Sequence, residues 1–299
     1  MPELPDVAVY VEALERFVVG QPIERVDVRS LFVVRSVDPP VAVAAGRRVT
    51  GARRIGKRIV LALEGELFLV FHMMIAGRLR WRAPAKTLAG KHVLAAFRFP
   101  SGTLTFTEAG TKKRASLYLV RGEAELRAHD RGGIEVLDAS LDQFARTLAS
   151  ESHTLKRALT DPALFSGIGN SFSDEILHRA KLSPFALTGS LGPAETKTLY
   201  EAVRTTLLEW TERLREEVGE GFPEKVTAFR EGMAVHGRYG KPCPVCGTTV
   251  QRIVYAENES NYCPRCQTGG KLLADRALSR LLHADWPRTI EELEERRAR

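Results

Sequence analysis

The spacing of apolar residues changes character along the chain. From Asp6 to about Phe17 they recur at intervals of three and four, which predicts a helix with one buried face, ended by Gly20 and Pro22. From residue 23 to about 127, short apolar runs alternate with turn sequences such as EGE and PSG, which is typical of an antiparallel sandwich or barrel. We expect the strands within residues 23–28, 47–56, 58–65, 66–74, 92–100, 103–110 and 116–126.

After Gly133 the pattern becomes helical. It predicts short helices within 141–149, 154–165 and 171–182, and a long helix from Pro193 to Val218 with one apolar stripe. A charged tail follows the last cysteine, and the spacing of Thr289 and Glu292 predicts a capping box at the start of its final helix.

Composition describes an ordinary folded protein. The 299 residues are 44% apolar and 27% charged, enough for two domains with real cores. The net charge of +7 suggests a polyanionic partner, unless the excess is spread evenly over the surface. We find no run of about 18 apolar residues and no signal-peptide profile, so we expect a cytosolic protein that does not bind membranes.

The four cysteines lie together. CPVC (Cys243, Cys246) and CPRC (Cys263, Cys266) are separated by 16 residues, and two such knuckles place four thiolates about 2.3 Å from a zinc ion. Four sulfurs leave no open coordination position, so the predicted metal is structural. Redox dithiols or unconnected buried cysteines are the competing interpretation. The surrounding basic segment could lie on a phosphate backbone, and a zinc ribbon could equally dock a protein.

A second motif is GIGN, residues 167–170. Gly167 and Gly169 permit a tight turn, and Asn170 stands where a helix would begin, with free amides available to an anion. A plain helix start explains the same residues. We expect Asp174 and Glu175 to assist the first helical turn electrostatically rather than to do chemistry.

The chain opens with MPELP. Removal of Met1 would leave Pro2 with a secondary α-amine whose pKa is near 8, so that a useful fraction is a neutral nucleophile. Glu3 beside it is placed to exchange protons. Alternatively, Pro2 and Pro5 only order the start of the first helix.

Together, the terminal PELP, the β-rich first half, GIGN opening a helix and the finger resemble the formamidopyrimidine-DNA glycosylase and endonuclease VIII family from Pro2 to about Lys271. The resemblance implies an α+β multidomain fold. It consists of an N-terminal antiparallel β-sandwich with a leading helix (1–133), a helix-two-turn-helix domain (134–229), a zinc-finger hairpin (230–272) and a charged helical tail (273–299).

The resemblance also implies an activity, namely removal of oxidised bases from damaged double-stranded DNA through a Schiff base, followed by β- or β,δ-elimination. Pro2 would attack C1′, Glu3 would protonate the deoxyribose ring, and Lys57 would contact phosphate and assist elimination. Residues matching DNA-contacting positions are His72, His92, Arg114, Asn170 and Lys271. One structural Zn²⁺ and a monomeric protein are expected.

Four positions depart from the family pattern: Asp6 replaces a glutamate, Ile75 an intercalating methionine, Ala115 a wedge phenylalanine and Asn258 an arginine that contacts phosphates. A small side chain at 115 cannot fill the gap left by a flipped base. Loss of the finger arginine favours a β-elimination product.

Two other classes of function stay open. A catalytically silent paralogue could bind damaged DNA through its clamp and zinc finger, and a zinc-ribbon protein could act in transcription or RNA handling. Retention of Pro2, Glu3 and Lys57 favours the enzyme, because a binding module has no need of a terminal amine.

Overall fold

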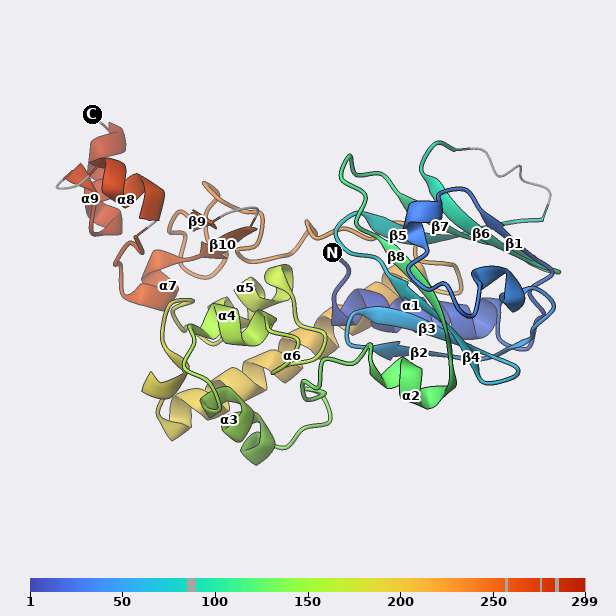
Figure 1. Ribbon diagram of the computed structural model, residues 1–299. Helices are drawn as coiled ribbons and strands as arrows, with labels where there is room; N and C mark the ends of the chain where they lie inside the picture. Colours follow the sequence, from blue (N-terminus) through green and yellow to red (C-terminus); the bar gives the residue numbers. More distant parts are fainter. Residues whose placement is uncertain (85–89, 256–257, 275, 283–284, 299) are drawn as a thin grey trace. The chain divides into compact units, whose positions relative to one another are not determined.

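The computed structural model describes residues 1–84, 90–255, 258–274, 276–282 and 285–298. It contains two compact units (Figure 1). Unit 1 comprises Met1–Gly132 and Glu209–Ala228, and unit 2 comprises Gly133–Leu208 and Phe229–Arg299. The helix α6 (Pro193–Val218) contributes its first part to unit 2 and its last part to unit 1.

Unit 1 contains two four-stranded antiparallel sheets, with strand orders β1-β6-β7-β5 and β2-β3-β4-β8. Side chains from both sheets form one apolar core, so the predicted sandwich is confirmed. The strands are β1 (Arg25–Val28), β2 (Val49–Ile55), β3 (Arg58–Leu63), β4 (Leu67–His72), β5 (Gly77–Arg82), β6 (Val93–Phe99), β7 (Gly102–Glu108) and β8 (Ser116–Arg121).

The leading helix, α1 (Leu4–Phe17), packs its apolar face into this core, where Tyr10 and Leu14 are fully buried. It begins two residues before the predicted start at Asp6, because the backbone N–H of Glu3 donates to Asp6 Oδ2 at 2.9 Å in a capping box. The carboxylate at position 6 therefore fixes where the helix begins.

Two predictions within unit 1 were wrong. Residues 122–126 were expected to continue a strand, but β8 ends at Arg121 and a short helix, α2 (Gly122–Arg127), follows. Gly122 adopts φ +72°, and the backbone N–H of Arg121 donates to the Glu125 carboxylate at 2.8 Å. The strand β5 was not expected. Short 3₁₀ helices cover Leu31–Val33 and Val41–Ala44.

Unit 2 combines helices with the cysteine-bearing hairpin. Its helices include α3 (Leu141–Ala149) and α6, both with the predicted bounds, and α4 (Leu155–Thr160) and α5 (Asn170–Arg179). A 3₁₀ turn covers Thr188–Ser190. The finger contains β9 (Gln251–Tyr255), β10 (Asn258–Tyr262) and α7 (Pro264–Thr268), and the tail contains α8 (Arg276–Leu282) and α9 (Ile290–Ala298).

The tail attaches to the finger through its backbone. The N–H of Ile290 donates to Gly270 O at 2.9 Å, and the Ile290 side chain is buried. At the start of α9 the predicted capping box forms in part. The N–H of Glu292 donates to Thr289 Oγ1 at 3.3 Å, but the Glu292 carboxylate accepts from the N–H of Arg288, one residue before the cap. Among the residues described, no helix combines the length and apolarity of a membrane span.

Candidate active site and zinc centre

The N-terminal residues of unit 1 lie at a buried position. Pro2 is buried, Glu3 is 2% exposed, and Lys57, in the turn between β2 and β3, is half-buried. Burial lowers the pKa of the terminal amine, which here belongs to Met1; Glu3 opposes this shift, while Arg78 and Lys57 add to it. Burial likewise lowers the pKa of Lys57 against the opposing charge of Glu3. The fold thus places the amine, Glu3 and Lys57 within electrostatic reach of one another.

His72 ends β4, where it pairs with Arg58 of β3 and with Ser116 of β8. Burial, and then the positive charges of Arg58 and Lys57, lower its pKa to about 4. The imidazole is therefore neutral at physiological pH, and it can offer a hydrogen bond to an anion but no full charge.

The segment after β4 makes a tight turn with an apolar tip. Met74 has φ +49°, and Ile75 is 56% exposed. The Arg78 guanidinium donates to Ile75 O at 3.0 Å, and a Cβ on Gly77 would lie 2.2 Å from Met73 O. This turn requires glycine at position 77 and holds Ile75 outward.

A buried acid shapes the neighbouring loop. Glu108 is 1% exposed, and its Oε1 accepts the backbone N–H groups of Arg114 at 2.9 Å and Ala115 at 3.1 Å. The Arg114 residue is exposed, whereas Ala115 is 3% exposed. Ala115 therefore faces the core and cannot serve as a wedge. His92 is half-buried, and its carbonyl accepts from Glu108 N–H at 2.9 Å. Sequence analysis missed the role of Glu108, because its partners follow it in an irregular loop.

In unit 2, the GIGN segment forms the expected turn. Gly167 adopts φ +84°, and α5 begins at the half-buried Asn170. The hydroxyl of Ser173 donates to Gly169 O at 2.6 Å, and Lys156 Nζ donates to Asn170 O at 2.7 Å. Hydrogen bonds from Ser173 of α5 and from Lys156 of α4 therefore stabilise the turn.

The expectation for Asp174 was wrong. Helix α5 begins at Asn170 and has no acidic residue in its first turn, so Asp174 lies beyond the turn it was expected to assist, and its side chain is fully buried. Lys156 Nζ lies 2.6 Å from Oδ1, and His236 Nδ1 lies 2.8 Å from Oδ2. Ser260 and Asn261 of the finger strand β10 each donate to the same carboxylate at 3.3 Å. One carboxylate therefore joins α4, α5 and the finger.

Glu175 also has an unexpected role. It is 6% exposed and accepts three backbone N–H groups, from Ala234 at 2.7 Å and from Val235 and His236 at 2.9 Å. Burial raises its pKa, and these hydrogen bonds oppose that shift. The carboxylate anchors the segment that leads into the first cysteine. Local spacing carried no signal of these contacts, because Lys156 lies 18 residues before Asp174 and the partners in the finger and its leading segment lie 59 to 87 residues along the chain.

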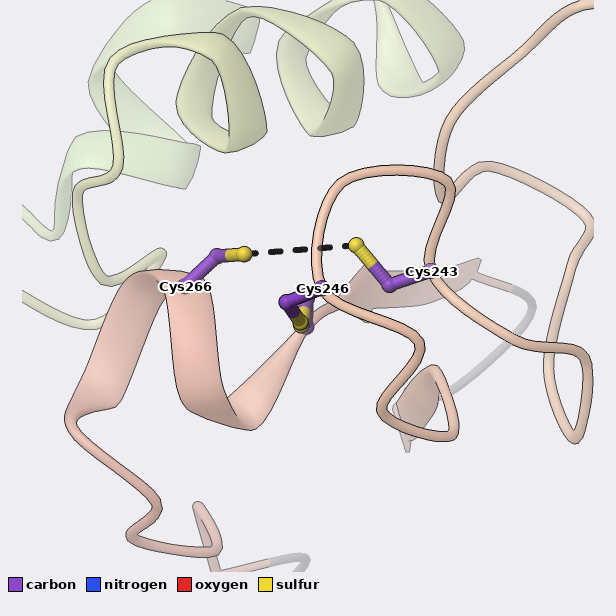
Figure 2. A group of neighbouring side chains, drawn as sticks. Cys243, Cys246 and Cys266 are labelled. Carbon is purple, nitrogen blue, oxygen red and sulfur yellow. Dashed lines mark hydrogen bonds between the residues drawn. The ribbon is translucent and has the colours of Figure 1, made fainter.

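The four cysteines meet at one point. Figure 2 labels three of them, with Cys266 on α7 and with Cys243 and Cys246 on the loop before β9. All four sulfur atoms lie within 4.8 Å of one another; Cys243 Sγ is 4.0 Å from Cys266 Sγ, and Cys246 Sγ is 3.4 Å from Cys263 Sγ. A tetrahedral zinc site with Zn–S bonds of about 2.3 Å has S–S edges of about 3.8 Å. The cluster fits a structural Zn²⁺, as predicted.

The sequence named two further residues of the finger, Asn258 and Lys271, and the structure describes the side chain of only the second. Asn258 is the first residue of β10, and its side chain lies outside the described residues. Lys271 is exposed just after α7, where its backbone bridges Thr289 of the tail. Pro2, Glu3, Lys57, His72, His92 and Arg114 belong to unit 1, and Asn170 and Lys271 belong to unit 2.

Three family models match the chain. The formamidopyrimidine-DNA glycosylase N-terminal domain matches residues 1–114, the formamidopyrimidine-DNA glycosylase H2TH domain matches 135–217, and the zinc finger found in FPG and IleRS matches 240–269.

Individual relatives agree with these matches. A formamidopyrimidine-DNA glycosylase of Thermus thermophilus is 34% identical over 281 residues, which cover 90% of this chain and 100% of that protein. The crystal structure of MutM (Fpg) from that organism has a TM-score of 0.73 and covers 89% of this chain and 98% of its own. An uncharacterised formamidopyrimidine-DNA glycosylase-like protein of Mycobacterium tuberculosis is 47% identical over 150 residues, 50% of this chain and 93% of that protein.

A complex of the Lactococcus lactis Fpg with DNA containing an abasic site shares the fold, with a TM-score of 0.78 at 23% identity over 89% of this chain and 99% of that one. Sandwich, helical region and four-cysteine finger follow one another along this chain in the order of the three family matches. The chain belongs to the formamidopyrimidine-DNA glycosylase family.

Proposed function

We propose that this protein is a base-excision repair DNA glycosylase with associated lyase activity, which removes oxidised bases from duplex DNA. The observation that carries this proposal is the burial of Pro2 and the neighbouring Glu3 at the start of α1, with Lys57 within electrostatic reach of the amino terminus. Family membership supports the reaction class, and the residue roles below are our assignment.

In the proposed reaction, Met1 is removed and the Pro2 nitrogen becomes the nucleophile. This nitrogen bonds to C1′ of the damaged nucleotide, while the bond from C1′ to the base breaks and the base leaves with a proton. Glu3 protonates the ring oxygen as the sugar opens, which gives an iminium, and loss of a C2′ proton then expels the 3′ phosphate. Pro2 is buried, and burial disfavours the charged form of an amine, so this position favours a neutral, nucleophilic nitrogen.

Each unit contributes residues proposed to bind DNA. In unit 1 the exposed Arg114 and the half-buried Lys57, His72 and His92 would contact the backbone, and in unit 2 Asn170 and the exposed Lys271 would do so. The amides at the start of α5 suit a phosphate. The protein is proposed to act as a monomer in the bacterial cytosol.

Borohydride trapping on abasic-site DNA tests the proposal. The wild type should form a covalent adduct, and Pro2→Gly should abolish it while DNA affinity stays within a few fold. Pro5→Gly is the matched control, because Pro5 also lies at the start of α1 and has no proposed chemistry. Mass spectrometry must find Met1 absent from the active protein.

A catalytically silent DNA-binding paralogue is the second candidate, favoured by the buried Ala115 in place of a wedge. That protein would bind abasic-site DNA without an adduct. Adduct formation by Pro2→Gly equal to that of the wild type would remove Pro2 from the mechanism.

A further inference from the structure

A buried histidine of the helical region touches a cysteine of the zinc centre. His178 lies in the last turn of α5, and its Nε2 is 3.3 Å from Cys243 Sγ. His178 is 6% exposed and Cys243 is 2% exposed. The contact joins residues 65 positions apart, both within unit 2.

The chemistry of a metal-bound thiolate decides the direction of this hydrogen bond. Such a sulfur carries no proton and acts only as an acceptor, so the imidazole must donate from Nε2–H, which fixes its tautomer. Four thiolates around one divalent ion leave a net charge of about −2 in a largely apolar shell. A donor aimed at one sulfur spreads that charge and stabilises the metal site.

The two sulfurs of the first knuckle receive different support. Cys246 Sγ has hydrogen bonds from the side chain and backbone of Thr248, a neighbour within the finger. Cys243 Sγ has its donor from α5, outside the finger. Val235 and Val250 pack around the cysteines, and both His178 and Cys243 are buried, so the donor from His178 is directional and shielded from water.

His178 belongs to one face of α5 that contacts the finger. Asp174, one helical turn earlier, accepts hydrogen bonds from Ser260 and Asn261 of β10. This face of α5 therefore contacts the hairpin through Asp174 and the first knuckle through His178.

We propose that His178 is a positioning residue of the zinc centre, whose Nε2–H donates to the Cys243 thiolate and thereby holds the first knuckle on α5. The inference concerns metal binding and holds whether or not Pro2 is the catalytic nucleophile.

Three substitutions test the donor itself. Gln places an amide N–H near the position of Nε2, Asn is too short to reach it, and Phe keeps the ring without a donor. Zinc-loaded full-length variants are mixed with excess chelator, and the release of zinc is followed with a metallochromic dye. His178→Phe and His178→Asn should release zinc about 10- to 100-fold faster than the wild type, and His178→Gln within a few fold of it.

A spectroscopic arm reports on the sulfur directly. In Co²⁺-substituted protein, the sulfur-to-metal charge-transfer band should shift in the Phe and Asn variants and stay in place in the Gln variant. His153→Phe is the control, because that histidine pairs with Glu151 in unit 2 and does not contact a cysteine in the described structure. Equal zinc release and equal spectra for the wild type and the Phe and Asn variants would overturn the proposal. If the His178→Phe variant fails to fold, the comparison of zinc release and spectra between His178→Asn and His178→Gln decides.

Discussion

Replacing Lys156 by Met should loosen unit 2 strongly, because the substitution leaves a buried carboxylate without its main counter-ion. The side chains of Lys156 and Asp174 are 4% and 0% exposed, and their charged atoms are 2.6 Å apart. Removing one partner of such a pair costs about 3–5 kcal/mol. Since about 1.4 kcal/mol is a factor of ten, the opening equilibrium of α4 and α5 should rise about 100- to 4,000-fold.

Amide hydrogen exchange measured by residue is the assay, on zinc-loaded protein at pH 7. Burial raises the pKa of Asp174, but the charges and hydrogen bonds of Lys156 and His236 prevail and hold it below its usual range. The carboxylate is therefore ionised at pH 7, and its stabilising contribution is lost only as the pH falls below about 4, through the folded-state pKa.

Lys197→Met is the matched control. Lys197 and Glu201 form a surface pair at 3.9 Å, with side chains 63% and 61% exposed, so its loss should cost under about 0.5 kcal/mol. If Lys156→Met changed the exchange of α5 amides no more than this control does, the bridging role assigned to the buried pair would be refuted.

Three further outcomes are expected in unit 1. NMR titration should find His72 neutral down to about pH 5, since its pKa is lowered to about 4. Because this pKa lies below the unfolded value, His72 destabilises the fold as the pH falls from about 6.5 toward 4. A titration inflection near pH 6.5 would contradict this prediction. Gly77→Ala should lower the melting temperature by several degrees, because its Cβ would lie 2.2 Å from Met73 O; an unchanged melting curve would show that the turn can rearrange. Ala115→Phe should cost about 1–3 kcal/mol in chemical denaturation and should not raise excision of oxidised bases, because position 115 faces the core; increased excision would place that residue at the DNA.

Sequence periodicity predicted those elements whose signals are local. α3 has a Ser140 cap whose hydroxyl accepts from Gln143 N–H at 3.2 Å, and its apolar spacing is regular. In β5, arginines alternate with Gly77, Leu79 and Trp81, which is itself a strand pattern, but the expected strands were those with longer apolar runs, so this one was missed. Gly122, at the start of α2, ends strand β8 with a positive φ. The sequence alone does not distinguish a glycine in a turn from a glycine within a strand.

In the candidate site, too, the features with local sequence signals could be predicted and those with distant partners could not. The cysteine spacing predicted the zinc centre, because the ligand geometry is encoded in each knuckle. The roles of Asp174 and Glu175 could not be predicted, because acids near the start of a helix are ordinarily explained by its dipole. Their actual partners come from α4, the finger and the segment that leads into the finger, which only the tertiary fold brings to α5.

These polar contacts explain how a small finger is held at a fixed place on the helices. Its apolar shell is slight, with Val235 and Val250 packed around the cysteines, and apolar burial is not directional. Hydrogen bonds to buried carboxylates are directional, and leaving one unmade is costly. Asp174, Glu175 and the amide of Gln267, which donates to Leu182 O at 2.9 Å, therefore set the orientation of the finger, while the metal sets its internal shape. A chain that lost only the metal would lose the finger's shape first, and these anchors would then lack properly placed partners.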